Sequence, residues 1–155
     1  MRGRALRHRA GRRGSGLLLG LILVPVVLVG CGGEPTLPAH TATPGPGVGT
    51  VATDAKGVQE ITLQTQDYYV FTPNTFTVDP GTVRLTVVNA ATDMTHNFRF
   101  TPDAGPAEID EEIPLLAPGD EKTIEFTVTG PGNYPFECSF HVQLNQVGTM
   151  TVRGS

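Results

Sequence analysis

The chain has very few cysteines, because only Cys31 and Cys138 occur among its 155 residues. Cys31 ends a predicted export signal, and its expected use there leaves Cys138 alone in the folded part. No internal disulfide can form, which excludes a disulfide-stapled scaffold. An unpaired thiol exported to an oxidising compartment is a liability, and permanent metal ligation is a good reason for keeping one.

Basic residues are also scarce once the first thirty residues are set aside. That segment holds six of the eleven lysines and arginines but none of the fifteen acidic residues. Five basic and fifteen acidic residues remain, which leaves a formal charge of −10. A surface of this sign does not suit nucleic acid as a partner. Any attachment to a membrane must then come from a lipid rather than from basic side chains.

Residues 1–30 have the pattern of a targeting signal. Six arginines precede an apolar run at residues 17–29, which is too short to span a bilayer as an ordinary helix. Residues 28–31, Leu-Val-Gly-Cys, resemble a bacterial lipobox, which implies that Cys31 is diacylated and becomes the mature N-terminus. The alternatives are an uncleaved membrane anchor or a soluble secreted protein. The Arg-Arg pair at residues 12–13 is a weak signal for twin-arginine rather than general export.

Residues 31–57 follow this signal and are dominated by Gly, Pro, Thr and Ala. Such a composition buries too little apolar surface to offset the entropy of ordering, so we predict a lipidated cysteine followed by a flexible, disordered linker. Residues 58–155 are long enough for a single modest domain.

The predicted domain contains no long stretch with apolar residues at helical spacing and no internal repeat. β-formers instead recur in short segments, most of them alternating with polar residues. The predicted strands are residues 58–64, 75–79, 83–89, 97–100, 122–128, 132–138 and 147–152. Pro-Gly turn signals separate several of them, which predicts an all-β, antiparallel Greek-key β-sandwich. Residues 102–116 are irregular, and we expect a loop or a short helix there.

Histidine is as sparse as cysteine, and its placement indicates a metal site. Of four histidines, His8 and His40 fall in segments expected not to fold, which leaves His96 and His141. Cys138-Ser-Phe-His141 places a thiolate and an imidazole three residues apart after a predicted strand. One Cys and two His are the equatorial ligands of a blue-copper site. Zinc accepts the same set with an open fourth position.

These segments resemble the cupredoxins, the small blue copper proteins of the plastocyanin and amicyanin type. Residues 134–152 are similar to their last strand–loop–strand, and His96-Asn97-Phe98 is similar to their early-histidine segment. The resemblance implies a cupredoxin-like sandwich holding one copper ion, with His96, Cys138 and His141 as ligands. It also implies that backbone amides near Asn97 donate hydrogen bonds to the Cys138 sulfur.

The axial position departs from the common family pattern. The usual ligand is a methionine two residues before a glycine that opens the last strand, and here that position is Gln146, before Gly148. Met150 lies four residues later, in a predicted strand, where it would face the core with Val152. We expect the side-chain oxygen of Gln146 to be the axial ligand, as in stellacyanin-like proteins, in preference to Met150. An amide oxygen is a harder donor than a thioether and favours Cu(II).

The resemblance implies an electron carrier rather than an enzyme. It would be a lipid-anchored, extracytoplasmic monomer that shuttles single electrons between redox proteins, such as a cytochrome or a membrane oxidoreductase. The alternative is a protein of the cell envelope that binds, sequesters or delivers copper. A dinuclear copper centre needs two cysteines in the loop, and multicopper enzymes need more histidines than the chain has. Cys138 and His141 lack the further groups that nucleophilic catalysis requires.

Three other groups of residues have two interpretations each. An acidic run is either a solvated loop or a docking face for a basic partner, and comprises Glu108, Asp110, Glu111 and Glu112. A few apolar residues either pack in the core or surround His141 as an electron-exchange patch, namely Met94, Val142 and Leu144. Three aromatic residues are better explained as core and surface strand positions than as electron relays, namely Tyr68, Tyr69 and Phe71.

Overall fold

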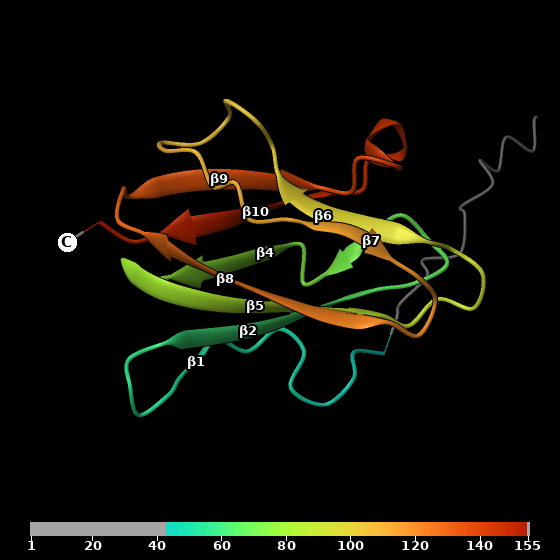
Figure 1. Cartoon of the computed structure of the whole chain (residues 1–155), viewed down its shortest axis with the longest axis horizontal. Coiled ribbons are helices and arrows are strands. Elements are labelled where there is room, and N and C mark those ends of the chain that lie inside the picture. The colour runs from blue at the N-terminus through green and yellow to red at the C-terminus, as the bar shows by residue number, and fades with distance from the viewer. Residues whose placement is uncertain (1–42, 155) are drawn as a thin grey trace, which may run out of the picture. The chain divides into compact units, whose positions relative to one another are not determined.

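The computed structural model describes residues 43–154, and these form a sandwich of two five-stranded sheets (Figure 1). The first sheet has the order β1 (Ala52–Thr53), β2 (Gln59–Thr65), β5 (Gly81–Asn89), β8 (Glu121–Val128), with β3 (Phe71–Thr72) also paired to β2. The second has the order β4 (Thr75–Val78), β10 (Val147–Val152), β9 (Gly132–Glu137), β6 (His96–Phe100), β7 (Ile113–Leu116).

The described residues contain no α-helix, and their one helical turn is the 3-10 helix η1 (Val142–Leu144). No helix in this part of the chain has the length and hydropathy needed to cross a bilayer. The prediction of an all-β sandwich is confirmed, and each of the seven predicted strands overlaps an observed one.

The sheets are mixed rather than wholly antiparallel, which corrects the prediction on one point. β2 pairs with β5 in parallel, and β4 pairs with β10 in parallel. The reason is a crossover: after β2 and the short β3 the chain passes to the other sheet to form β4, and β5 then enters the first sheet in the direction of β2. Parallel neighbours require such a connection, whereas a tight hairpin would have made them antiparallel.

Part of the predicted linker is ordered. Residues 52–53 form β1 against β2, and Val48 makes a parallel bridge to Thr62. The amide of Gly49 also donates to the carbonyl of Thr62 over 2.9 Å. The flexible-linker prediction is therefore wrong for this stretch, because an open strand edge offers backbone groups that a chain of any composition can pair with. Residues 1–42, with His8, His40 and Cys31, lie outside the described residues.

Residues 102–116, expected to form a loop or a short helix, instead end in the short strand β7. Ile113 and Leu116 are buried, whereas Pro114 and Leu115 between them are exposed. Four residues with this pattern show no period of two, so the strand gave no recognisable signal. Pro114 is tolerated because β7 lies at the edge of its sheet.

The core lies between the inner faces of the two sheets. β5 shows the expected alternation, with Val83, Leu85 and Val87 fully buried. On its outer face the guanidinium of Arg84 bridges Glu60 of β2 and Glu125 of β8. The three side chains are 38–51% exposed, so the bridge adds little stability and burial of the inner face dominates.

An aromatic cluster anchors the two strands that carry predicted ligands. The rings of Phe71, Phe98 and Phe136 lie 5.2–5.9 Å apart, centroid to centroid. Phe98 follows His96 by two residues and Phe136 precedes Cys138 by two, and side chains two apart on a strand share a face. A Cβ at Gly148 would lie 2.2 Å from the Phe136 ring, so glycine is what allows that ring to lie across β10.

Candidate metal centre

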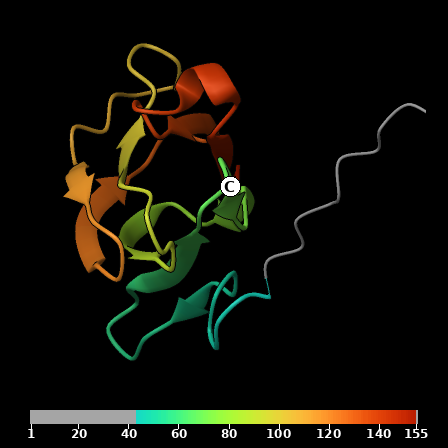
Figure 2. The same ribbon diagram turned by 90° about the vertical axis from the view of Figure 1, so that its right-hand side faces the viewer.

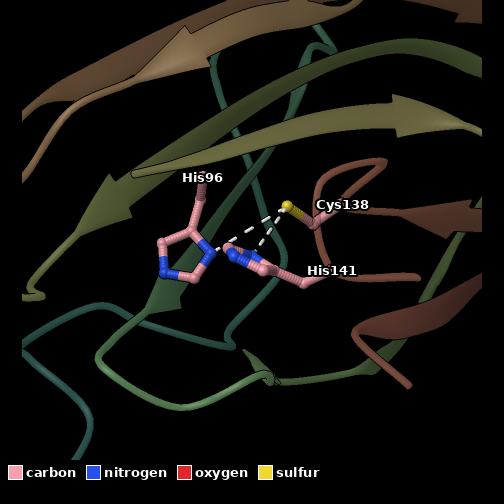
Figure 3. Close-up of side chains that lie close together, drawn as sticks. All are labelled: His96, Cys138 and His141. Carbon is pink, nitrogen blue, oxygen red and sulfur yellow. Dashed lines mark hydrogen bonds between the residues drawn. The ribbon is translucent and has the colours of Figure 1, made fainter. Parts of the chain in front are cut away.

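Three predicted ligands meet at one end of the sandwich. The sulfur of Cys138 lies 3.9 Å from Nδ1 of His96 and 3.5 Å from Nδ1 of His141. The candidate ligand atoms all lie within 4.8 Å of one another. Figure 3 shows the three side chains pointing toward one another, and Figure 2 looks onto this end of the sandwich. His96 and Cys138 are fully buried, whereas His141 is half-buried.

Cys138 and His141 lie on a hairpin loop between β9 and β10. The amide of Cys138 donates to the carbonyl of Gln146 over 3.0 Å and closes the loop at its base. The amide of His141 donates to the carbonyl of Cys138, also over 3.0 Å. Asn145 takes the left-handed conformation, with φ of 65°, which ends η1 and turns the chain toward Gln146. These backbone contacts hold the loop without help from its exposed side chains.

The structure brings Gln146, and not Met150, to the three predicted ligands. Oε1 of Gln146 lies 2.9 Å from Nδ1 of His96 and 3.1 Å from Nδ1 of His141. In the sheet, Met150 of β10 lies opposite Tyr134 of β9 on one side and Phe76 of β4 on the other, and its side chain belongs to the hydrophobic core. Of the two axial candidates, Gln146 is thus the one that offers an atom to the site.

A carbonyl group sets the tautomer of His96. Nε2 of His96 lies 2.9 Å from the backbone carbonyl of Gln66, which can only accept, so Nε2 carries the proton. Burial lowers the pKa of His96 below its ordinary value, more than its hydrogen bonds raise it, and nearby His141 lowers it further. The ring is therefore neutral at pH 7, and Nδ1 presents a lone pair to the site.

The site as a whole is a convergence of lone pairs. Nδ1 of His96 and Oε1 of Gln146 are both acceptors, yet they lie 2.9 Å apart in a buried position. The sulfur of Cys138 and Nδ1 of His141 face the same point. A cation among them turns this repulsion into attraction. One sulfur, two imidazoles and a weak oxygen donor are the set that blue-copper sites use, so the residues fit copper.

Asn97 ties the two ligand segments together. Its backbone amide donates to the sulfur of Cys138 over 3.4 Å, which confirms the donor that the resemblance implied. Its side chain donates to the hydroxyl of Ser139 and accepts from the amide of Ser139, both over 2.7 Å. These contacts limit the movement of the sulfur relative to His96.

Asp67 holds the loop that leads into His96. Its carboxylate accepts hydrogen bonds from the backbone amides of Thr92, Asp93 and Met94 over 2.7, 3.0 and 3.1 Å. From the other side, Nδ2 of the buried Asn89 donates to the carbonyl of Met94 over 2.8 Å. The Asp67 contacts, led by those of Thr92 and Asp93, lower the pKa of Asp67 below its ordinary value.

Several exposed apolar side chains lie on or next to the ligand loops. Phe140 and Leu144 are both about half exposed and flank His141 in the sequence. The ring of Tyr69 lies 5.0 Å from that of His141. Of the other residues interpreted in two ways, Met94 and Val142 are half-buried and Phe71 is core. The acidic residues Glu108, Asp110, Glu111 and Glu112 are all exposed.

Sequence reasoning missed two residues near the site, namely Gln66 and Asp67. Gln66 acts through its backbone carbonyl, which every residue has, so no residue type could have indicated it. The carboxylate of Asp67 receives backbone amides from 25 to 27 residues further along the chain. Only the fold brings these segments together.

Residues 58–153 match the family described as copper binding proteins, plastocyanin/azurin family. The chain is 41% identical to a chloroplastic plastocyanin of Oryza sativa subsp. indica over 88 residues, 54% of each chain. It is 36% identical to plastocyanin A/B of Petroselinum crispum over 86 residues, 54% of this chain and 87% of that one. The chain thus spans about half the length of the rice relative.

One solved structure with this fold is reduced auracyanin from the photosynthetic bacterium Roseiflexus castenholzii. It superposes with a TM-score of 0.54 at 27% sequence identity, covering 61% of this chain and 97% of that one.

The Asp67 contacts predict a pH-dependent loss of stability. A carboxylate with a lowered folded pKa adds stability above its unfolded value, near 3.8, and this stability is lost as the pH falls through the folded value. Metal-free Asp67→Asn should therefore unfold at a lower urea concentration than wild type at pH 6, and the gap should shrink below pH 3.8.

The matched control is Glu111→Gln, which removes an exposed carboxylate from another loop and should leave no such gap. A gap between wild type and Asp67→Asn that stays constant from pH 6 to pH 3 would contradict the prediction.

Proposed function

The chain belongs to the plastocyanin/azurin family of copper-binding proteins, and from this premise we propose that it carries single electrons through one copper ion at His96, Cys138 and His141. The convergence of one sulfur and two ring nitrogens within 4.8 Å supports this assignment of ligands. Copper in such a set exchanges one electron between Cu(I) and Cu(II).

The surroundings of the site suit electron transfer because they resist rearrangement. The sulfur is held by the amide of Asn97, and the ring of His96 by the carbonyl of Gln66. The ligand loop is closed by the backbone bond between Cys138 and Gln146. A site that keeps one arrangement in both oxidation states transfers electrons with little reorganisation, and rigid strands provide that arrangement.

We further propose Gln146 as the axial ligand through Oε1. The oxygen lies within 3.1 Å of Nδ1 of both histidines, and the side chain is fully buried. A hard oxygen donor stabilises Cu(II) relative to Cu(I), which lowers the reduction potential below that of a methionine-ligated relative.

Electron exchange would take place at His141, the one half-buried side chain among the three proposed ligands. Phe140 and Leu144 offer apolar surface beside it, which suits brief contact with a redox protein. The partners would be a cytochrome or a membrane oxidoreductase outside the cytoplasm, reached from a lipid anchor at Cys31.

Copper delivery or sequestration is the alternative function. A delivery site must surrender its ion to a partner, and two of the three proposed ligands here are fully buried. This burial favours the carrier. Rapid transfer of Cu(I) to a competing chelator, together with a missing visible thiolate band, would favour delivery.

The carrier proposal predicts a strong colour that depends on one sulfur. The full-length protein in detergent, loaded with Cu(II), should show an intense visible thiolate-to-copper band and the paramagnetic-resonance signal of a blue-copper site. Cys138→Ser should lose the band, whereas Cys31→Ser should keep it, because Cys138 is the cysteine that the described part of the chain brings to the site. A colourless wild-type protein would refute the proposed centre.

The axial proposal predicts a higher potential when the oxygen is replaced by a thioether. In Gln146→Met the affinity ratio of Cu(I) to Cu(II) should rise at least tenfold, or about 59 mV in the reduction potential. Gln143→Met is the control, because it places the same side chain at an exposed position of η1. An unchanged or lowered potential in Gln146→Met, measured by redox titration, would count against an axial Gln146.

Lipidation at Cys31 predicts that removal of this thiol releases the protein from the membrane. Expressed in a bacterium that processes lipoproteins, the wild-type protein should incorporate labelled palmitate and partition into detergent. Cys31→Ser should do neither, whereas Cys138→Ser should do both. Equal partitioning of Cys31→Ser and wild type would contradict lipidation at this residue.

A further inference from the structure

A buried hydroxyl stands at the end of β2 beside the metal centre. Alternation of buried and exposed residues breaks down there, because Leu63, Gln64 and Thr65 are all buried. Thr65 is fully buried, and a buried hydroxyl is costly unless it is hydrogen-bonded. Its Oγ1 accepts a hydrogen bond from Nε2 of Gln146 over 2.8 Å, across 81 residues of sequence.

This contact bears on which end of the Gln146 amide faces the site. The amide has an oxygen with lone pairs and a nitrogen with two protons, and only the oxygen can be a metal ligand. Nε2 also lies 3.5 Å from the backbone carbonyl of Val70, which can only accept. The nitrogen therefore belongs on the side of Thr65 and Val70, and Oε1 is left facing His96 and His141.

Turning the amide by 180° would reverse both contacts. Oε1 would then face the carbonyl oxygen of Val70, and the protons of Nε2 would point at the ring nitrogens. Thr65 is itself held in place, because its carbonyl accepts the amide of Ala90 over 2.8 Å. The next residue, Gln66, holds His96 through its own carbonyl.

We propose that Thr65 is a positioning residue, which fixes the amide of Gln146 with its oxygen toward the copper site. This inference rests on the proposed function and on Gln146 as the axial ligand. β2 contributes no ligand, yet through Thr65 it would decide whether the axial donor is available. A methionine at position 146 would not need this help, because a thioether has no nitrogen end to turn inward.

The test is a double-mutant cycle read out by the reduction potential. Thr65→Val keeps the shape of the side chain and removes the hydroxyl, so the oxygen donor is no longer fixed. The affinity ratio of Cu(I) to Cu(II) should rise at least threefold, or about 28 mV at 59 mV per tenfold change. Thr65→Ser retains the hydroxyl and should shift the potential by less than half as much.

The same Thr65→Val change in the Gln146→Met background should leave the potential unchanged, because no amide remains to be oriented. Equal shifts in both backgrounds, or no shift with Gln146 present, would overturn the inference while leaving the proposed electron carrier intact. An unchanged potential in Gln146→Met alone would overturn both the axial ligand and the role of Thr65.

A readout without copper guards against a purely structural effect. In the metal-free protein, the side-chain amide protons of Gln146 should exchange slowly with solvent in wild type and Thr65→Ser, and at least tenfold faster in Thr65→Val. If Thr65→Val does not fold, Thr65→Ala also lacks the hydroxyl and takes its place in both measurements. Equally slow exchange with and without the hydroxyl would refute the proposed contact.

Discussion

The crowding of lone pairs at one buried point is the constraint on which the rest of this structure depends. A sulfur, two ring nitrogens and an amide oxygen all face one position, and the closest pair of acceptors is 2.9 Å apart. The lone pairs of Nδ1 of His96 and Oε1 of Gln146 repel each other in the absence of a cation. The arrangement persists because three of the four groups, those of His96, Cys138 and Gln146, are each held by a hydrogen bond from outside the site.

Two of those hydrogen bonds come from residues 65–66, a segment that provides no ligand, and the third comes from Asn97, which follows His96 in β6. The carbonyl of Gln66 holds His96, the amide of Asn97 holds the sulfur, and the hydroxyl of Thr65 holds Gln146. The sandwich then holds these segments through burial. Phe98 lies two residues after His96 and Phe136 two residues before Cys138, and the two rings pack together in the core. On β6 and at the end of β9, a core phenylalanine and a proposed metal ligand are therefore only two residues apart.

The sequence was informative where function depends on residue type and spacing. The set His96, Cys138 and His141 pointed to a metal, alternating segments pointed to seven strands, and the position two residues before Gly148 pointed to Gln146. The sequence was uninformative where the contacts are made by backbone atoms. The carbonyl of Gln66, the parallel pairing of β2 with β5 and the addition of β1 to a sheet edge depend on main-chain groups that carry no side-chain signature. Asp67 was missed because its partners are brought near only by the fold.

The ligand loop is closed by backbone hydrogen bonds, while Phe140, Gln143 and Leu144 point their side chains outward. The atoms that define the metal geometry and the side chains that a visiting protein would touch are therefore different parts of one nine-residue segment. Mutations at the outward positions can change the surface without altering the ion's surroundings. Under the proposed function, the side chains that would contact a redox partner can therefore be exchanged independently of those that would hold the ion.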